Sequence, residues 1–387
     1  MPTRIFITVA EVSGDQHAAQ LVRSLKQLDP SLVIEGIGGP LMREAGCVIH
    51  HETVRKAAMG LGGAFRYFEI KPVFNWARRY FRDHRPDLQI GVDSPSMNFH
   101  FAKHAHSLGV PVLQYVAPQL WAWREGRMRK VRKWIDHVAC ILPFEEAYFR
   151  GHGVAATFVG HPLFDELPPA RTPAPAGERF PHHPPAIGLL PGSRKGEAVN
   201  HAGPMLAVAA RVFARHPAAR FLIPTTAATD PIVRHELARA AGPLPVDVQL
   251  DAFDSLVPQC DLCVTASGTA TLHVAGHNVP MVVVYGGNRL LWYGLAKWLV
   301  TTDTFALVNL LSANRRHVVP ELIPWWGDPV PVADVVLDFL ANPDKLEAQR
   351  RDLHALVSTL DRPGASTSVA KLALGMVRGA SAVGASS

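Results

Sequence analysis

The chain has few cysteines and few charged residues for its length, and each shortage excludes a class of protein. Four cysteines in 387 residues cannot form the disulfide framework of a small secreted domain, so we expect a reducing compartment. Charged residues are 19% and apolar residues 48% of the chain, which excludes a disordered protein. No uninterrupted apolar stretch reaches the roughly 18 residues of a membrane span, and the N-terminal run turns acidic too early for a signal peptide.

Several cofactor signatures are also missing. Neither a Walker A loop nor the glycine pattern of a dinucleotide fold occurs, which argues against nucleotide hydrolysis and hydride transfer. Cys260 and Cys263 form one C-x-x-C, but no second pair lies at zinc spacing, and the flanking LCVTA indicates a buried strand. We therefore interpret both cysteines as packing residues and expect no metal site.

What the sequence does contain is an alternation of short apolar strands with helical segments. The expected strands cover 4–9, 32–36, 87–92, 110–116 and 137–142, and, after a proline-rich stretch, 186–190, 219–224, 246–250, 261–265 and 280–285. This pattern predicts an α/β protein with two doubly wound, Rossmann-like domains whose sheet edges face a shared cleft. We expect domains over 1–167 and 186–345, a linker over 168–185, and C-terminal helices with a frayed tail over 346–387.

Two loops in the second domain have the composition of phosphate-binding loops. Ser267-Gly268-Thr269 follows a strand and opens a helix, so main-chain N–H groups at a positive helix end can approach a diphosphate. Pro191-Gly192-Ser193-Arg194 repeats this design and adds a guanidinium that can pair with a leaving phosphate. A loop of this kind taken alone is more typical of a capped helix start, but two in one domain favour the phosphate interpretation.

Acidic residues follow two strands of the first domain. Asp93 comes directly after LQIGV and before Pro95, so we expect its carboxylate at the sheet edge, where it would act as a general base; the alternative is that it caps the next helix. Glu11, Ser13 and Asp15 follow the first strand and are interpreted as a binding or hinge cluster, with helix capping as the alternative.

Two segments mix aromatic and basic side chains. The chain has a net charge of +6, and these segments favour anionic partners, either a lipid surface or RNA. A solvated helix face and a packed core face are the ordinary explanations of such segments. The first runs over 65–82 and the second contains Trp121, Trp123, Arg124, Arg127, Arg129, Lys130, Arg132 and Lys133.

Taken in order, the motifs resemble those of the bacterial lipid-A-disaccharide synthases, which are inverting GT-B glycosyltransferases. The resemblance spans nearly the whole chain and rests on EVSGDQHAA, GIGGPLMREAG, AMGL, GVDSPSMN, YVAPQLWAWREGR, LPFEEAYF, FVGHPL, LLPGSRKGE, ASGTATL and VPEL. It implies transfer from UDP-2,3-diacylglucosamine to 2,3-diacylglucosamine 1-phosphate through a β-1,6 linkage, with release of UDP and no obligatory metal or other cofactor. It also implies a cytoplasmic protein held peripherally on the inner membrane, with no nucleic-acid partner; an oligomer is compatible with it.

The resemblance also assigns residues. By matching position, Asp93 is the essential aspartate and Arg194 is the arginine beside the diphosphate. The other implied residues are Ser193, Ser267, Gly268, Thr269, Asn309 and Glu321 around the nucleotide, and Glu11, Ser13, Asp15, Asn98, Trp123 and Arg124 around the acceptor substrate.

The chain departs from the family pattern at several polar positions. Ser96 and Met97 stand in place of a second aspartate and an aromatic residue, His273 replaces a glutamate, and Pro324 replaces a glutamine, while the Gly62–Ala64 region lacks a further glutamate. The departures keep one alternative open, and the two-domain plan with its nucleotide loops keeps a second. One is a paralogue that binds UDP-sugars or acidic lipids without turnover, and the other is a UDP-N-acetylglucosamine 2-epimerase.

Overall fold

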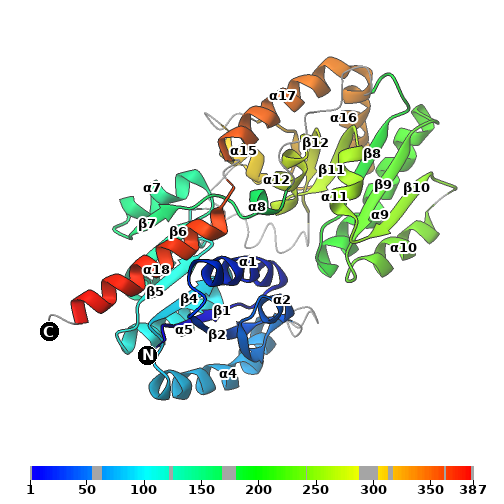
Figure 1. Ribbon diagram of the computed structural model, residues 1–387. Helices are drawn as coiled ribbons and strands as arrows, with labels where there is room; N and C mark the ends of the chain where they lie inside the picture. The colour runs from blue at the N-terminus through cyan, green and yellow to red at the C-terminus, as the bar shows by residue number, and fades with distance from the viewer. Residues whose placement is uncertain are drawn as a thin grey trace. The chain divides into compact units, whose positions relative to one another are not determined.

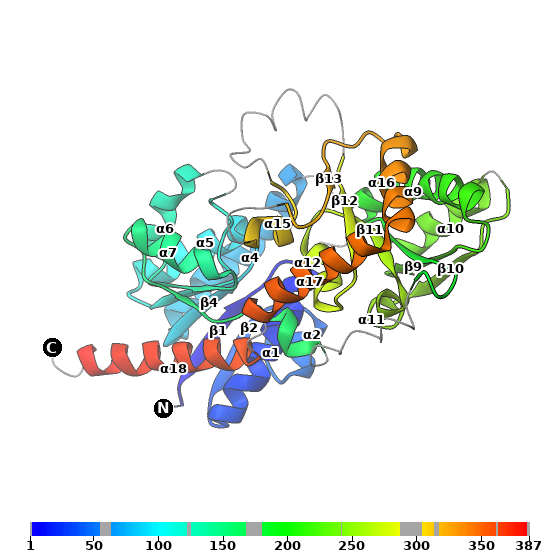
Figure 2. The same cartoon turned by 90° about the horizontal axis from the view of Figure 1, so that it is seen from above.

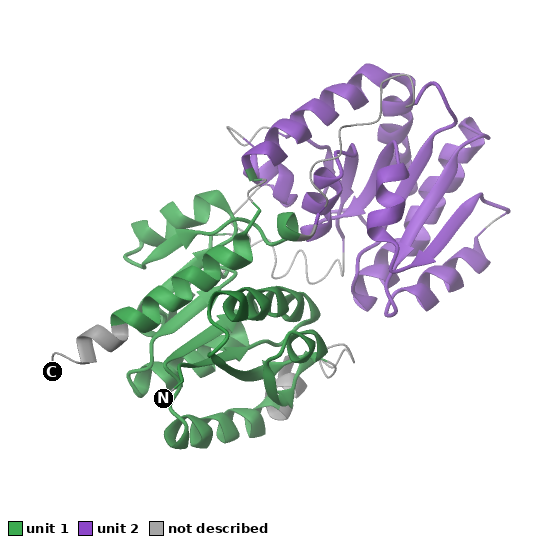
Figure 3. Ribbon diagram, viewed as in Figure 1, with its two compact units in different colours: residues 1–166, 360–387 green, residues 167–359 purple. Residues whose placement is uncertain are grey.

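The computed structural model describes residues 2–54, 63–121, 125–167, 180–240, 242–286, 304–312, 317–360 and 363–384. The chain divides into two compact units (Figure 3). Unit 1 comprises Met1–Glu166 and Leu360–Ser387, and unit 2 comprises Leu167–Thr359. Residues 168–179 of the expected linker lie outside the described residues.

Unit 1 is built on a parallel sheet that, within the described residues, has seven strands in the order β3-β2-β1-β4-β5-β6-β7 (Figure 1). The strands are β1 (Arg4–Thr8), β2 (Val33–Gly38), β3 (Val48–Glu52), β4 (Leu88–Val92), β5 (Val112–Tyr115), β6 (His137–Cys140) and β7 (Ala156–Phe158). Its helices are α1 (Val12–Leu28), α2 (Pro40–Glu44), α4 (Gly63–Asp83), α5 (Pro95–Ser107), α6 (Met128–Trp134), α7 (Pro143–Gly151), α8 (Leu163–Glu166) and α18 (Ala365–Gly384), with a 3₁₀ turn over Glu125–Arg127.

Helices cover both faces of this sheet, and each face has its own apolar core. One core joins β1 and β4 to α1 and α18, through residues such as Leu21 and Val369. The other joins the opposite face to α4, α5 and α6, through residues such as Phe81 and Phe101. Because helices cover both faces of the sheet, β4 is buried throughout, including its one polar residue, Gln89.

The C-terminal helices expected over 346–387 are divided between the two units. Helix α17 (Pro343–Leu360) belongs to unit 2 apart from its final residue, whereas α18 returns to unit 1 and runs beside α1 (Figures 1 and 2). The physical reason is local. Val369, Ala370 and Ala373 are fully buried in the α1 core, and Asp165 accepts hydrogen bonds from the first main-chain N–H groups of α18.

Unit 2 repeats the design with a parallel sheet whose described strands run in the order β10-β9-β8-β11-β12-β13. These are β8 (Ala186–Leu190), β9 (Arg220–Thr225), β10 (Val246–Leu250), β11 (Leu262–Ala266), β12 (Met281–Val284) and β13 (Glu321–Leu322). Its helices are α9 (Lys195–Arg215), α10 (Asp230–Arg239), α11 (Phe253–Leu256), α12 (Thr269–Gly276), α15 (Leu307–Leu311), α16 (Pro329–Ala341) and α17, with a 3₁₀ turn over Val257–Gln259. Helices α9 and α16 pack side by side over the main core of this sheet. Cys260 and Cys263 are buried, free thiols, as the packing interpretation requires.

The aromatic residues in the second half of α4 pack inside unit 1. Phe74 contacts Phe101 with ring centroids 5.0 Å apart, and Trp76 stacks on Tyr80 at 4.7 Å. For these residues the core explanation is therefore correct, while the side chains of Phe65–Phe68 lie outside those described. Of the helices in the described part of the chain, none is both long enough and apolar enough to cross a membrane.

Candidate active site

The strand orders give each unit one position where neighbouring strands connect in opposite directions. In unit 1 this switch point lies between β1 and β4, and in unit 2 it lies between β8 and β11. Open α/β sheets bind ligands beyond the carboxyl ends of the strands at such a point. The loops that follow three of these strands contain Asp93, Arg194 and Ser267, and Ser13 lies in the first turn of α1, after the loop that follows β1. Residues predicted from separate stretches of sequence are thus brought to one edge within each unit.

Asp93 lies in a strained turn at the switch point of unit 1. It follows β4 directly and has φ +50°, and Ser94 follows with φ +39°. Two successive non-glycine residues in the left-handed region are costly, and such strain persists where a site requires it. Ser94, rather than Asp93, is the N-cap of α5, and the cap makes no side-chain hydrogen bond. The alternative that the Asp93 carboxylate caps this helix is therefore wrong.

Side-chain amides of unit 1 donate hydrogen bonds to the main-chain carbonyls of this turn. The buried Asn98 side chain donates from Nδ2 to the carbonyls of Val92, at 3.1 Å, and Asp93, at 2.6 Å. Gln114 donates from Nε2 to the Asp93 carbonyl at 3.2 Å, and Thr8 donates its hydroxyl to Asn98 Oδ1. Asn98 was expected to contact substrate, and this is a correction: its amide is consumed inside the unit, where it fixes the turn that presents Asp93.

The cluster after β1 separates into exposed and buried members. The exposed Ser13 hydroxyl lies 3.5 Å from Asp93 Oδ2, and Gly14 lets α1 approach, since a Cβ there would lie 3.0 Å from Val9 Cγ1. Glu11 is the N-cap residue of α1 and is partly exposed. Asp15 is only 1% exposed, and its carboxylate accepts hydrogen bonds from the N–H groups of Gly39, Leu41 and Met42.

Asp15 therefore stabilises the start of α2, and its expected role in substrate binding is also corrected. Burial raises the pKa of this carboxyl, while the three N–H donors lower it. The capping alternative explains all of its observed contacts.

Arg127, at the end of the 3₁₀ turn after β5, contacts the helix that follows Asp93. Arg127 Nη1 donates to Ser96 Oγ at 3.3 Å, which brings a guanidinium to the first turn of α5. Trp123 and Arg124, which were expected to contact substrate, lie outside the described residues. Trp121 is described, and its indole N–H donates to the buried Glu145 at 3.1 Å.

In unit 2 the loop after β8 presents Arg194 at the start of α9. Glu197, in the first turn, accepts hydrogen bonds from the main-chain N–H of Arg194 and, at 3.0 Å, from the Arg194 guanidinium. The Arg194 side chain is nevertheless 70% exposed. Gly192 has φ +108°, and a Cβ there would lie 2.5 Å from Glu197 Oε2, so this turn requires glycine. Ser193 is exposed, and its carbonyl accepts from the Thr226 hydroxyl.

The loop after β11 lies beside this one, because β8 and β11 are neighbours in the sheet. Ser267 donates its hydroxyl to the Phe305 carbonyl at 3.0 Å, and Gly268 has φ +148° with open space where a Cβ would point. Thr269 is exposed at the first position of α12. The N-cap Gly268 makes no side-chain hydrogen bond, and uncapped N–H groups at a helix start suit an anion; phosphate binding by this loop stays a prediction.

Asn309 and Glu321 support this edge from within. Glu321 accepts from the N–H groups of Phe305 and Ala306 and from Asn309 Nδ2 at 2.6 Å. Asn309 is fully buried, and its amide also pairs with the main chain of Val319. Both were expected to surround the nucleotide. For Asn309 this is corrected, since its side chain fixes the segment that receives the Ser267 hydroxyl, and Glu321 holds the same segment.

Two Rossmann-like units, one with two neighbouring loops that open helices at its switch point and the other with a partly exposed carboxylate there, define a protein of the GT-B class. Among solved structures, MurG of Acinetobacter baumannii has a TM-score of 0.55 at 15% identity, covering 97% of this chain and 100% of that chain. UDP-GlcNAc 2-epimerase of Neisseria meningitidis, bound to UDP-GlcNAc, has a TM-score of 0.60 at 12% identity, covering 92% and 99%. These likenesses show the fold.

The sequence comparisons show the family. The family model described as lipid-A-disaccharide synthetase matches residues 5–375. A lipid-A-disaccharide synthase of Anaeromyxobacter sp. (strain K) is 36% identical over 381 residues, which cover 97% of this chain and 98% of that protein. The chain belongs to the lipid-A-disaccharide synthase family and is a glycosyltransferase, so the resemblance inferred from the motifs is confirmed.

Proposed function

We propose that this protein transfers the sugar of UDP-2,3-diacylglucosamine to 2,3-diacylglucosamine 1-phosphate, which gives the β-1,6-linked lipid A disaccharide 1-phosphate and UDP. Family membership supports the substrate pair. The observation that carries the mechanism is the placement of Asp93. Asp93 lies beyond the carboxyl end of β4, at the switch point. It and the next residue have left-handed backbone conformations, and buried side-chain amides donate hydrogen bonds to its carbonyl.

On the acceptor side, Asp93 is the general base. Its carboxylate takes the proton of the acceptor 6-hydroxyl as that oxygen forms a bond to the anomeric carbon of the donor. Arg127, near Ser96, supplies positive charge for the acceptor phosphate on the same side of unit 1. A single displacement inverts the configuration at the anomeric carbon.

On the donor side, the bond from the anomeric carbon to the UDP oxygen breaks, and its electron pair leaves with UDP. The charge that develops on the diphosphate is stabilised by Arg194 and by the main-chain N–H groups after β8 and β11. Arg194 leaves or shares its exposed ion pair with Glu197 to do so, at a cost that is small for such a pair. In this mechanism fixed positive groups do the work of a metal cofactor.

We further propose that the protein acts at the cytoplasmic face of the inner membrane as a peripheral protein. Both substrates carry acyl chains, and α6 exposes Arg129, Lys130, Arg132 and Lys133, which suit anionic headgroups. Acylated anionic substrates account for this basic surface without a nucleic-acid partner.

A paralogue that binds UDP-sugar without turnover is the second candidate function. The observation that favours it is Ser96, which occupies the position of a family carboxylate and is bonded to Arg127. The epimerase alternative is not favoured, because the epimerase likeness is one of fold at 12% identity while the 36% identical relative is a synthase.

The test incubates purified protein with the UDP-diacylglucosamine donor and the diacylglucosamine 1-phosphate acceptor in detergent micelles, and measures disaccharide and UDP together. Equal amounts of both products support the proposal. Binding of UDP without product would establish the paralogue, and conversion of UDP-N-acetylglucosamine alone would establish the epimerase. Arg194→Ala should lower kcat by about 10²–10³, the usual loss when one transition-state donor is removed.

A further inference from the structure

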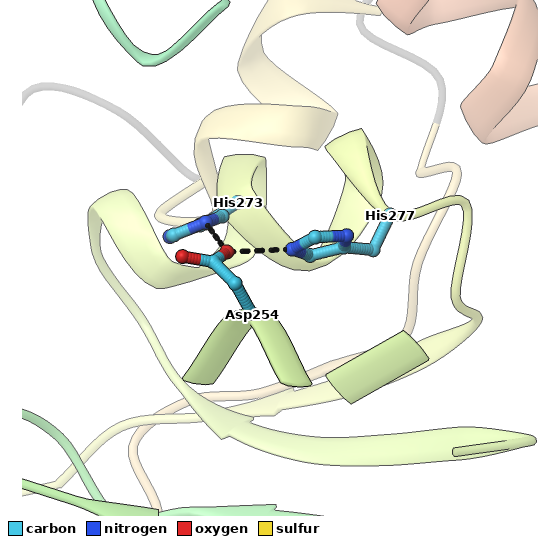
Figure 4. A group of neighbouring side chains, drawn as sticks. All are labelled: Asp254, His273 and His277. Atoms are coloured by element: carbon cyan, nitrogen blue, oxygen red, sulfur yellow. Dashed lines mark hydrogen bonds and ion pairs between the residues drawn. The ribbon is translucent and has the colours of Figure 1, made fainter. Parts of the chain in front are cut away.

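We infer that Asp254, His273 and His277 of unit 2 form a binding site for a late first-row divalent cation such as Zn²⁺. Figure 4 shows both imidazole rings directed at the same carboxylate. The ligand atoms of the three residues all lie within 4.8 Å of one another. None of the three is part of the transfer mechanism proposed above, so the inference goes beyond it.

The secondary structure brings the three side chains together. His273 lies on α12 and His277 is the C-cap residue of the same helix, four residues later, so both project from one face. Two histidines at this spacing on a helix are a recurrent zinc-binding arrangement. Asp254 comes from α11, and Phe253 beside it stacks on the His273 ring with centroids 4.2 Å apart. The stacking fixes the orientation of the His273 ring toward the carboxylate.

The distances are close to those of a coordination sphere. Nε2 of His273 lies 2.6 Å and Nε2 of His277 lies 2.8 Å from Asp254 Oδ1. Ligands about 2.05 Å from a tetrahedral Zn²⁺ are about 3.3 Å from one another, so the carboxylate must retreat by roughly half an ångström. Asp254 can do this because its side chain is 63% exposed, whereas His277 is 4% exposed and is held in place by the fold.

The chemistry of the ligand set favours a metal over a simple hydrogen-bonded cluster. In the structure one carboxylate oxygen receives both imidazoles, which requires each ring to carry its proton on Nε2. A divalent cation replaces these two protons and bonds all three residues at once. Imidazole nitrogen with one carboxylate selects zinc, cobalt or nickel over magnesium and calcium, and three protein ligands leave a position open to solvent.

The site also couples two elements of unit 2. The cation would join α11 to α12, whose first residue is Thr269 of the anion-binding loop after β11. We therefore expect metal binding to raise the thermal unfolding temperature of the protein.

The test measures metal binding alone, without sugar substrates, so its outcome is independent of the transfer activity. Protein freed of metal with a chelator is titrated with Zn²⁺ by calorimetry, and with Co²⁺ by visible absorption, whose intensity reports a four- or five-coordinate site. We expect one equivalent to bind, and Asp254→Asn, His273→Ala and His277→Ala each to weaken binding at least tenfold. His354→Ala, an exposed histidine on α17, is the matched control and should bind like wild type.

Two further measurements keep the inference falsifiable if the buried His277 variant misfolds. His273→Gln replaces a less buried ligand and retains a hydrogen-bonding side chain, and circular dichroism checks that it folds. Crystals of the wild type soaked in zinc should give an anomalous peak between the three residues. Zinc binding that survives all three substitutions, a peak elsewhere, or no stoichiometric binding would each overturn the inference.

Discussion

Replacing Asp93 with asparagine separates its chemistry from its conformation. Asparagine is isosteric and is one of the few non-glycine residues that accept a positive φ, so the turn at φ +50° should be retained. The hydrogen bonds that hold the turn go to the Asp93 carbonyl, which the substitution leaves intact. Among the described residues, the side-chain hydrogen bond at stake is that from the Ser13 hydroxyl to Asp93 Oδ2, at 3.5 Å. We therefore expect an unfolding temperature close to that of the wild type.

The same substitution removes the proposed proton acceptor. Loss of a general base lowers the rate by about 10²–10⁴, or about 3–5 kcal/mol of barrier, and this should appear in kcat with little change in KM. Asp93→Ala loses the base and also places alanine in the left-handed region, so it should be less stable than Asp93→Asn by about 1–2 kcal/mol. The two variants should thus share a kinetic defect and differ in stability.

The assay follows UDP release and disaccharide formation at initial rate, with thermal unfolding recorded on the same samples. Asp83→Asn, at the exposed end of α4, is the control for the loss of an acidic side chain in unit 1. A kcat for Asp93→Asn within threefold of wild type would remove Asp93 from the chemistry. Equal stability of the asparagine and alanine variants would refute the argument from backbone strain.

Three further predictions follow from contacts within the units. Burial raises the pKa of Glu145 to about 7, against the N–H donors of Trp121, Leu142 and Ile141, which lower it. Between pH 4.5, the pKa of this group in the unfolded chain, and about pH 7, the folded state therefore binds one more proton than the unfolded state. The free energy of unfolding should fall by up to about 3 kcal/mol as the pH rises through this window. Urea unfolding of Glu145→Gln should lack this dependence on pH. Asp165→Ala removes the acceptor of three N–H groups at the start of α18 and should destabilise unit 1 by about 2 kcal/mol in the same measurement. Gly192→Ala forces a Cβ against Glu197 and should raise the KM for the UDP-sugar several-fold, and an unchanged KM would contradict the assigned role of the loop after β8.

The central strands of both units could be predicted because each is an apolar run bounded by polar loops. β4 and β8, for example, are buried throughout and follow the expected ranges 87–92 and 186–190 closely. The strands that were missed are short or lie at sheet edges. β3 carries two histidines in VIHHE, β7 has three residues and β13 has two. Their strand conformation depends on a neighbouring strand more than on their own side chains.

The candidate site could be located but not fully sorted from the sequence. A polar residue after a parallel strand often lies at the ligand-binding edge, and this rule predicted the positions of Asp93 and Arg194 after β4 and β8 and of Ser13 at the start of α1. The zinc-type cluster was missed because its aspartate comes from a different helix, α11, and the spacing of His273 and His277 alone carries a weak signal.

The sequence could not show which polar side chains form hydrogen bonds with the main chain and which point to a ligand. Four of the predicted site residues lie near the same loops as Asp93 and Arg194, but their side chains form hydrogen bonds with main-chain groups of their own unit. They are Asp15, Asn98, Asn309 and Glu321. A sharp turn at a sheet edge leaves carbonyl and N–H groups without strand partners, and buried amides and carboxylates must satisfy them. The turn that presents Asp93 therefore depends on buried side chains such as Asn98. It follows that exchange of Asn98 for an apolar residue should lower kcat without any contact to substrate. The Val92 carbonyl would lose the donor at 3.1 Å, and the Asp93 carbonyl would lose the shorter of its two side-chain donors and keep only Gln114.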